Sequence, residues 1–302
     1  MKTRFAFPPN HGRGRPTRAG LTRIEVVTVL AMLGVLACLL QPALAHDASR
    51  GLRALCLHRL AQFGRALQMY ASDSREWLPP NMDDSNLNPY GNWVGGNVAP
   101  GGAHEYNPDV LRDPTRSLLF AYLNGDVEVF RCPAETRRGR YQGTDPALLG
   151  KYVGNARSVA LNGAVGTKAN FSGRAPVDGP WLDGIHSHTA NKIWRCYAKI
   201  SDFGDPGPGQ LITILEEDPF SINDGSFSFV GPSEQQNYKL IDWPSTLHDM
   251  AGAVSFGDGH AEIHTWQDPR TQVINGNVAL STQPGNQDIR WLSTHISVLV
   301  GP

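Results

Sequence analysis

The stretch AGLTRIEVVTVLAMLGVLACLL, residues 19–40, decides how this chain is organised, because it sets one carboxylate at the edge of a long apolar run. The uncharged run that follows Glu25 extends from Val26 to Ala45, which is long enough to cross a bilayer of about 30 Å as a helix. An acidic residue is costly in such a segment, at roughly 3 kcal/mol for Asp at the helix centre. We therefore expect Glu25 to have a specific role.

Charge is distributed unevenly around this run. Residues 1–20 contain no acidic residue and carry the basic residues Lys2, Arg4, Arg13, Arg15 and Arg18. This pattern predicts a single-pass inner-membrane protein over 26–45, with its N-terminus cytoplasmic and the chain beyond residue 46 extracytoplasmic. Over the whole chain, 27 basic residues balance 28 acidic ones, so we expect no nucleic-acid partner.

Three interpretations of the N-terminus are open. A secretory signal peptide could be cut after Ala45, which would release a protein that starts at His46. An uncut signal anchor would leave Glu25 without a role. A leader cut after Gly20 would place Glu25 at the fifth position of the mature chain. The long basic region and the position of Glu25 favour the third interpretation.

With Gly20, Leu21 and Glu25 in this order before an apolar span, the segment resembles the prepilins, which are the type IV pilins and the pseudopilins of type II secretion systems. The resemblance implies that a prepilin peptidase cuts after Gly20 and that Leu21 becomes a methylated N-terminus. It also implies that Glu25 binds the terminal amine of a neighbouring subunit. Implied partners are other pilin or pseudopilin subunits, an assembly platform and the membrane. Arg23 departs from the family pattern, which has an uncharged residue at that position.

A helical stripe continues beyond the apolar run. Apolar residues recur at steps of three and four at Leu52, Cys56, Leu60, Phe63, Leu67 and Tyr70. Pro79 and Pro80 prevent the helix from continuing far past Asp73. We predict an α+β, pilin-like fold with a leader over 1–20, a helix over 21–75 and an exported body over 76–302. The helix would pack, with its membrane half and its amphipathic half, on a small antiparallel sheet with long loops, whose expected strands are 127–130, 211–215, 253–256 and 261–266.

The segment STLHDMAGAVSFGDGHAEIHTWQDPRT, residues 245–271, predicts a hairpin with a tight turn at 257–259. His248 stands nine residues before Asp258 and Gly259, which matches the H-X9-DG motif of a large group of prepilin-like proteins. The resemblance extends over most of the chain and is weakest over 135–200. The structural interpretation of the motif is a hydrogen bond between His248 and Asp258.

Two sets of residues are candidate metal ligands. His260, Glu262 and His264 alternate onto one face of the second hairpin strand, and with His248 they offer the set of two histidines and a carboxylate that suits iron or zinc. The acidic loop with Glu216, Asp218 and Asp224 offers oxygen ligands for calcium. The resemblance supports calcium, because type II major pseudopilins use this ion in a C-terminal loop.

Cys38 lies within the apolar run. Of the three cysteines beyond it, Cys56 and Cys132 are favoured as a disulfide, although spacing alone does not fix a pairing and Cys196 is left over.

We expect no enzyme, since the chain lacks the G-x-S-x-G, HExxH and phosphate-loop motifs. The alternative is an extracytoplasmic enzyme or binding protein that uses the His/Asp/Glu cluster of the hairpin. A sugar-binding variant of it is suggested by Trp77, Trp93, Trp181 and Trp194.

Overall fold

The structure is a computed structural model that describes residues 20, 22–81, 91–170, 173–179, 194–231, 238–272 and 282–300; the side chains of residues 37–48 and 169–170 are not described. The chain forms two compact units, Met1–Ala48 and Ser49–Pro302. The helices are α1 (Arg23–Asp73), α2 (Asp109–Arg112) and α3 (Gln287–Ile296), with 3-10 helices η1 (Phe120–Leu123), η2 (Val127–Phe130) and η3 (Ile200–Asp202).

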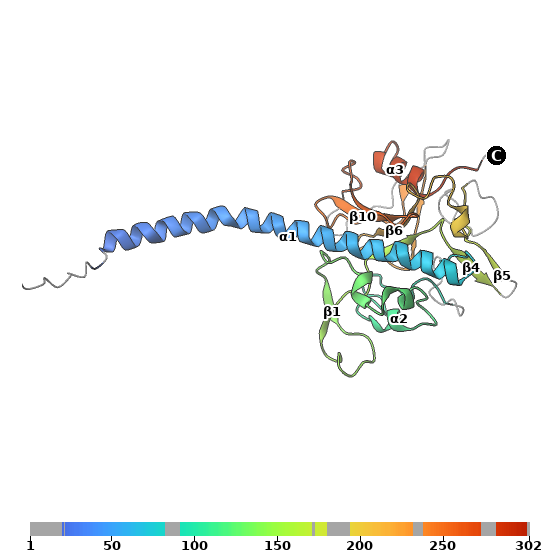
Figure 1. The fold of residues 1–302 in the computed structure, drawn as a ribbon, viewed down its shortest axis with the longest axis horizontal. Coiled ribbons are helices and arrows are strands. Elements are labelled where there is room, and N and C mark those ends of the chain that lie inside the picture. The colour runs from blue at the N-terminus through green and yellow to red at the C-terminus, as the bar shows by residue number, and fades with distance from the viewer. Residues whose placement is uncertain are drawn as a thin grey trace, which may run out of the picture. The chain divides into compact units, whose positions relative to one another are not determined.

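A mixed five-stranded sheet forms the centre of the second unit (Figure 1). Its strands, in spatial order, are β11 (Ala261–Thr265), β10 (Ala251–Phe256), β6 (Ile212–Glu216), β3 (Val159–Asn162) and β7 (Ser226–Phe227). All neighbours are antiparallel except β7, which runs parallel to β3. Every residue of β10, β6 and β3 is buried, so the sheet is covered on both faces.

Three two-stranded sheets complete the second unit. They pair β1 (Arg138–Arg140) with β2 (Tyr152–Gly154), β4 (Thr167–Asn170) with β5 (Gly173–Pro176), and β8 (Phe229–Val230) with β9 (Lys239–Leu240).

The part of α1 that belongs to the second unit buries one stripe, at Cys56, Leu60, Phe63, Leu67 and Tyr70. The steps of three and four residues place these side chains on one face of the helix. Phe63 packs edge-on against Trp93 and Phe130, with ring centroids 6.0 and 5.1 Å apart. Leu52, the first residue of the expected stripe, is 38% exposed, so burial begins one turn later than predicted.

Two loops hold this part of α1 by its arginines. The guanidinium of Arg53 donates to the backbone carbonyl of His248 at 2.6 Å, and that of Arg59 donates to the carbonyl of Arg131. Between the hairpin and the helix the backbones meet at two glycines: a Cβ on Gly64 would lie 2.7 Å from the Cα of Gly259. Gly259 has φ of +92°, as the tight turn of the β10–β11 hairpin requires.

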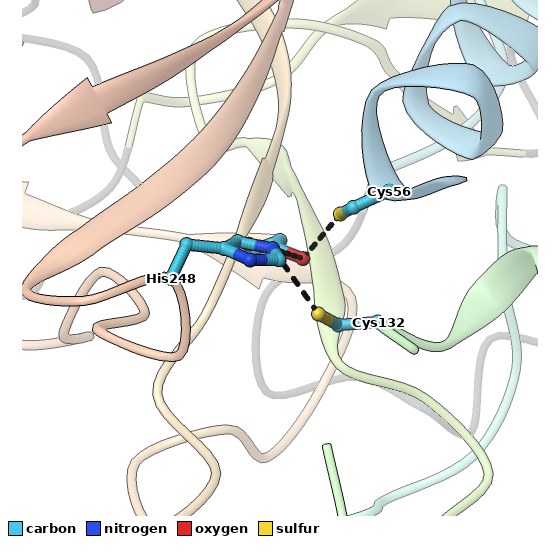
Figure 2. A group of neighbouring side chains, drawn as sticks. Cys56, Cys132 and His248 are labelled. Atoms are coloured by element: carbon cyan, nitrogen blue, oxygen red, sulfur yellow. Dashed lines mark hydrogen bonds and ion pairs between the residues drawn. The ribbon is translucent and has the colours of Figure 1, made fainter. Parts of the chain in front are cut away.

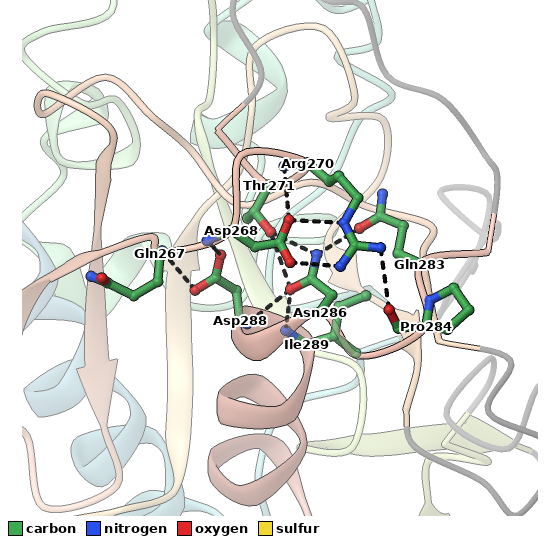
Figure 3. Close-up of polar contacts among 9 residues, drawn as sticks. All are labelled: Gln267, Asp268, Arg270, Thr271, Gln283, Pro284, Asn286, Asp288 and Ile289. Atoms are coloured by element: carbon green, nitrogen blue, oxygen red, sulfur yellow. Dashed lines mark hydrogen bonds and ion pairs between the residues drawn. The ribbon is translucent and has the colours of Figure 1, made fainter.

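The N-terminus of α3 is fixed by a polar network (Figure 3). The side chain of Asn286 accepts hydrogen bonds from the backbone N–H groups of Asp288 and Ile289, which the first turn of a helix leaves without partners. Asp288 in turn accepts from the N–H groups of Gln267 and Asp268. The chain after β11 is thereby tied to the last helix.

The predicted fold class is wrong. It required one long helix, with a membrane half and an amphipathic half, packed on a small antiparallel sheet. The chain instead divides after Ala48, so only the part of α1 from Ser49 onward belongs with the sheet. The aromatic contacts of that part are with loops and 3-10 helices, such as Tyr70 with Tyr122, rather than with strands. The sheet is also mixed, and residues 127–130 form η2 instead of a strand.

The predicted single-pass segment over 26–45, and the inner-membrane location that depended on it, are also wrong. In the part of the chain that the structure describes, no helix is both long enough and apolar enough to span a membrane.

The close approach of Gly64 and Gly259 makes a testable prediction about packing. Gly64→Ala should lower the free energy of unfolding by about 1–3 kcal/mol, because the new methyl group meets backbone that cannot yield easily. The matched control is Gly51→Ala in the same helix, where a Cβ would meet nothing within 4 Å. That change should be neutral or stabilise by up to about 1 kcal/mol. Urea unfolding measures both; equal effects would contradict the packing described here.

Candidate metal centre

Four side chains from distant parts of the sequence converge beside α1. They are Cys56 of α1, Cys132 after η2, Glu216 at the end of β6, and His248 in the loop before β10. Figure 2 shows Cys56, Cys132 and His248 pointing toward one another. One ligand atom from each of the four lies within 4.8 Å of those of all the others, and all four residues are buried.

Local structure explains why each side chain points inward. Cys56 lies on the buried stripe of α1, and Glu216 ends a central strand whose residues are all buried. The backbone N–H of Cys132 donates to Ser158 Oγ at 2.6 Å. The N–H of His248 donates to the carbonyl of Ala251 at 3.1 Å, which closes the loop that leads into β10.

The distances within the cluster are short. His248 Nε2 lies 3.4 Å from Cys132 Sγ and 3.3 Å from Glu216 Oε2. The thiol of Cys56 donates to Glu216 Oε1 at 2.5 Å. Backbone N–H groups complete the surroundings: Ala253 donates to Glu216 Oε2 at 2.9 Å, and Ala134 donates to Cys132 Sγ at 3.3 Å.

The four side chains of the cluster shift one another's pKa values. Burial disfavours a charged imidazole, but the contacts with Cys132 and Glu216 outweigh it and raise the pKa of His248 to about 10. Burial likewise acts to raise the pKa of Glu216, yet the interaction with His248 leaves it below its usual value. The neighbouring Cys56 side chain lowers the pKa of the Cys132 thiol, while the proximity of Cys132 together with burial raises the pKa of Cys56. His248 and Glu216 thus form a buried pair, with His248 Nε2 3.3 Å from Glu216 Oε2.

The chemistry open to this group is ligation rather than turnover. Thiolate, imidazole and carboxylate are all ligands of transition metals. The exposed fractions of the four residues are 3% or less, so no substrate reaches a thiol or the imidazole. Cys56 and Cys132 are free thiols, so the expected disulfide is not formed, although the two residues do lie together.

The H-X9-DG motif divides between two places. His248 enters the buried cluster, whereas Asp258 Oδ1 pairs with Nδ1 of His260 at 2.6 Å on the exposed hairpin turn. The expected hydrogen bond between His248 and Asp258 is therefore wrong: both side chains have nearer partners. Gly259 makes the turn that contacts Gly64.

The second hairpin strand does not assemble its predicted metal site. His260 stacks on Phe256 at 4.3 Å, and His264 stacks on Trp291 at 3.5 Å, so aromatic neighbours occupy both rings. Burial lowers the pKa of His264. Glu262 is exposed between them. Among the described residues, the single group of side chains positioned to hold a metal is the cluster around Cys56.

The acidic loop is also separated by the fold. Glu216 belongs to the buried cluster, whereas Asp218 accepts from the N–H of Phe220 and Asp224 from that of Ser226. The fully buried Arg157 donates to the carbonyl oxygen of Asp224. These carboxylates thus stabilise turns, and within the described residues they do not converge on one ion.

At the other end of the chain, Glu25 closes the first turn of α1. Its carboxylate accepts from the backbone N–H of Thr22 at 2.7 Å, and its own N–H donates to Thr22 Oγ1 at 3.3 Å, which forms a reciprocal capping arrangement. The bond from the Thr22 N–H lowers the pKa of Glu25, which is fully exposed. Gly20 lies just outside the helix, and Leu21 falls outside the described residues.

Sequence reasoning named all four cluster residues but assigned them to different sites. Comparison of the chain with family models, with curated proteins and with solved structures finds no match. The argument about the cluster therefore depends on its geometry and chemistry.

The different surroundings of two histidines give a prediction. His248→Ala should lower the free energy of unfolding by about 3 kcal/mol or more, because it leaves a buried carboxylate and thiol without their partner. His260→Ala, twelve residues later, removes an exposed pair and should cost less than about 1 kcal/mol. Thermal and urea unfolding of both variants checks this. A larger loss in the His260 variant would contradict the assignment.

Proposed function

We propose that this chain is a prepilin-like subunit, cut after Gly20 by a prepilin peptidase and assembled with other subunits through the apolar part of α1. The observation that carries the proposal is the exposed apolar surface of residues 24–36. Its large side chains are between 42% and 79% exposed; they are Ile24, Val26, Val27, Val29, Leu30, Met32, Leu33, Val35 and Leu36.

An exposed apolar surface of this kind is stabilised when another apolar surface packs against it. Burying a large apolar side chain stabilises by about 1.5–3 kcal/mol relative to full exposure, and soluble monomers rarely leave a continuous apolar patch of this size. The exposed side chains surround the helix rather than forming one stripe, which is typical of a helix with neighbours on several sides. Packing among several copies of the same helix supplies such neighbours.

Glu25 suits a role in this packing. Its carboxylate lies at the start of the apolar surface and binds only local groups of Thr22 among the contacts described for it. When neighbouring helices cover that surface, the carboxylate loses water and requires a cationic partner. Cleavage after Gly20 would create an amine four residues before Glu25, and the amine of a neighbouring copy is a partner of the right charge.

The first prediction concerns processing. In cells that contain a prepilin peptidase, the N-terminal peptide of the purified chain should begin at Leu21, and Gly20→Ala should leave most of the chain uncut. Mass spectrometry of the N-terminal peptide measures this. A terminus at His46, or the same cleavage in the Gly20 variant, would overturn the proposal.

The second prediction concerns assembly. Glu25→Ala should still be cut after Gly20, yet should reduce the fraction of processed chain that sediments as large assemblies by at least about tenfold. The physical reason is the loss of a buried charge pair, for which about 1.4 kcal/mol corresponds to each factor of ten. Glu262→Ala, which removes an exposed carboxylate from the hairpin, is the matched control and should assemble normally. Equal sedimentation of the unmodified chain, the Glu25→Ala variant and the Glu262→Ala variant would contradict the role of Glu25.

A further inference from the structure

The buried cluster lies outside the apolar segment and plays no part in the proposed assembly, so its role is a separate question. Its four members are two thiols, one imidazole and one carboxylate. Buried ionisable groups are retained where they are paired or coordinate a metal. A cluster that gathers four of them from four elements therefore calls for an explanation beyond packing.

The donor set is typical of zinc. Zn²⁺ binds cysteine sulfur, histidine nitrogen and carboxylate oxygen, and its structural sites have four protein ligands in a tetrahedron. Metal–ligand bonds of about 2.0–2.3 Å place the donor atoms of such a site roughly 3.3–3.8 Å apart. His248 Nε2 stands at 3.4 Å from Cys132 Sγ and at 3.3 Å from Glu216 Oε2, within this range. The pair formed by Cys56 and Glu216 is closer, and an ion would enter by separating it.

The outer surroundings also suit a metal centre. Ligating carboxylates and thiolates are usually hydrogen-bonded by a second layer of groups that orients them. Here the N–H of Ala253 fixes one oxygen of Glu216, and the N–H of Ala134 points at the sulfur of Cys132. The loop that carries His248 is held to α1 by Arg53. Three of the ligands therefore have supports that do not depend on the ion.

We propose that Cys56, Cys132, Glu216 and His248 bind one Zn²⁺ ion, and that this ion fastens α1 to the body. The site is structural rather than catalytic, since all four positions are protein ligands and all are buried. It joins a helix, a loop, a central strand and the loop of the H-X9-DG motif.

The ion would add to the attachments that the motif makes to the helix, which include the hydrogen bond from Arg53 to the backbone carbonyl of His248. His248 holds α1 at Cys56 through the metal, and Gly259 contacts α1 at Gly64, two turns further along. The nine residues between His248 and Asp258 span one strand and its turn, so the motif spacing sets the distance between the two attachments. His248 and Gly259 would thus attach the motif to α1 at two different points.

The test begins with the metal content of the full chain, purified under reducing conditions without a metal-affinity tag. Elemental analysis should find about one zinc ion per chain. His248→Ala and Cys132→Ser should lower that content at least tenfold. The matched controls, His260→Ala and Cys196→Ser, alter a histidine and a cysteine outside the cluster and should retain the metal.

Two measurements on the unmodified protein remain decisive if the variants fail to fold. Removal of zinc with a chelator should lower the Tm by on the order of 10 °C, and added Zn²⁺ should restore it. Replacement by Co²⁺ should give the visible bands of tetrahedral cobalt together with a thiolate-to-cobalt charge-transfer band. Absence of zinc, with no cobalt spectrum on titration, would overturn the proposal. Recovery of Cys56 and Cys132 as a disulfide from the metal-free native protein would overturn it in favour of a covalent link.

Discussion

The attachment of α1 to the body is the constraint on which the rest of the structure depends. The helix contributes Phe63 to an aromatic cluster with Trp93 and Phe130, and its arginines bind the segment after η2 and the loop before β10. Cys56 enters the buried cluster, and Gly64 lies against the backbone of Gly259. Since Cys132, Glu216 and His248 come from segments far apart in the chain, the cluster can form only after those segments have assembled around the helix.

The two compact units share one helix, α1, which buries an apolar stripe in the second unit and exposes apolar side chains in the first. From Ser49 onward the helix buries its apolar stripe in the body, and its exposed positions are mixed, with Arg65 as well as Leu55 and Met69. Between Ile24 and Leu36 its large apolar side chains are exposed, and this is the surface that the proposed assembly would cover. The proposed zinc ion would hold the helix from Ser49 onward against the body while residues 24–36 bind neighbouring copies.

The sequence alone predicted several features because they depend on local periodicity. The stripe from Cys56 to Tyr70, strands at 211–215, 253–256 and 261–266, and the turn at 257–259 are confirmed within a residue or two. It failed where a pattern was compatible with more than one structure. VEVF alternates like a strand, yet Asp126 caps it as a 3-10 helix through the N–H of Glu128. The apolar run after Glu25 suggested a membrane span that the described helix does not support.

By itself, the sequence determined which side chains have chemistry to offer: it singled out Cys56, Cys132, Glu216 and His248, and it marked Glu25 beside an apolar surface. Which of them meet was decided by tertiary structure alone. A disulfide, an acidic calcium loop and a histidine hairpin were equally consistent with spacing, because ligands from different elements leave no local signature. The buried ends of β6 and of the loop before β10 brought Glu216 and His248 to the two cysteines, whereas His260 and His264 stack on Phe256 and Trp291. Within the described part of the chain, these four buried donors are the one group that the structure gathers around a possible metal position.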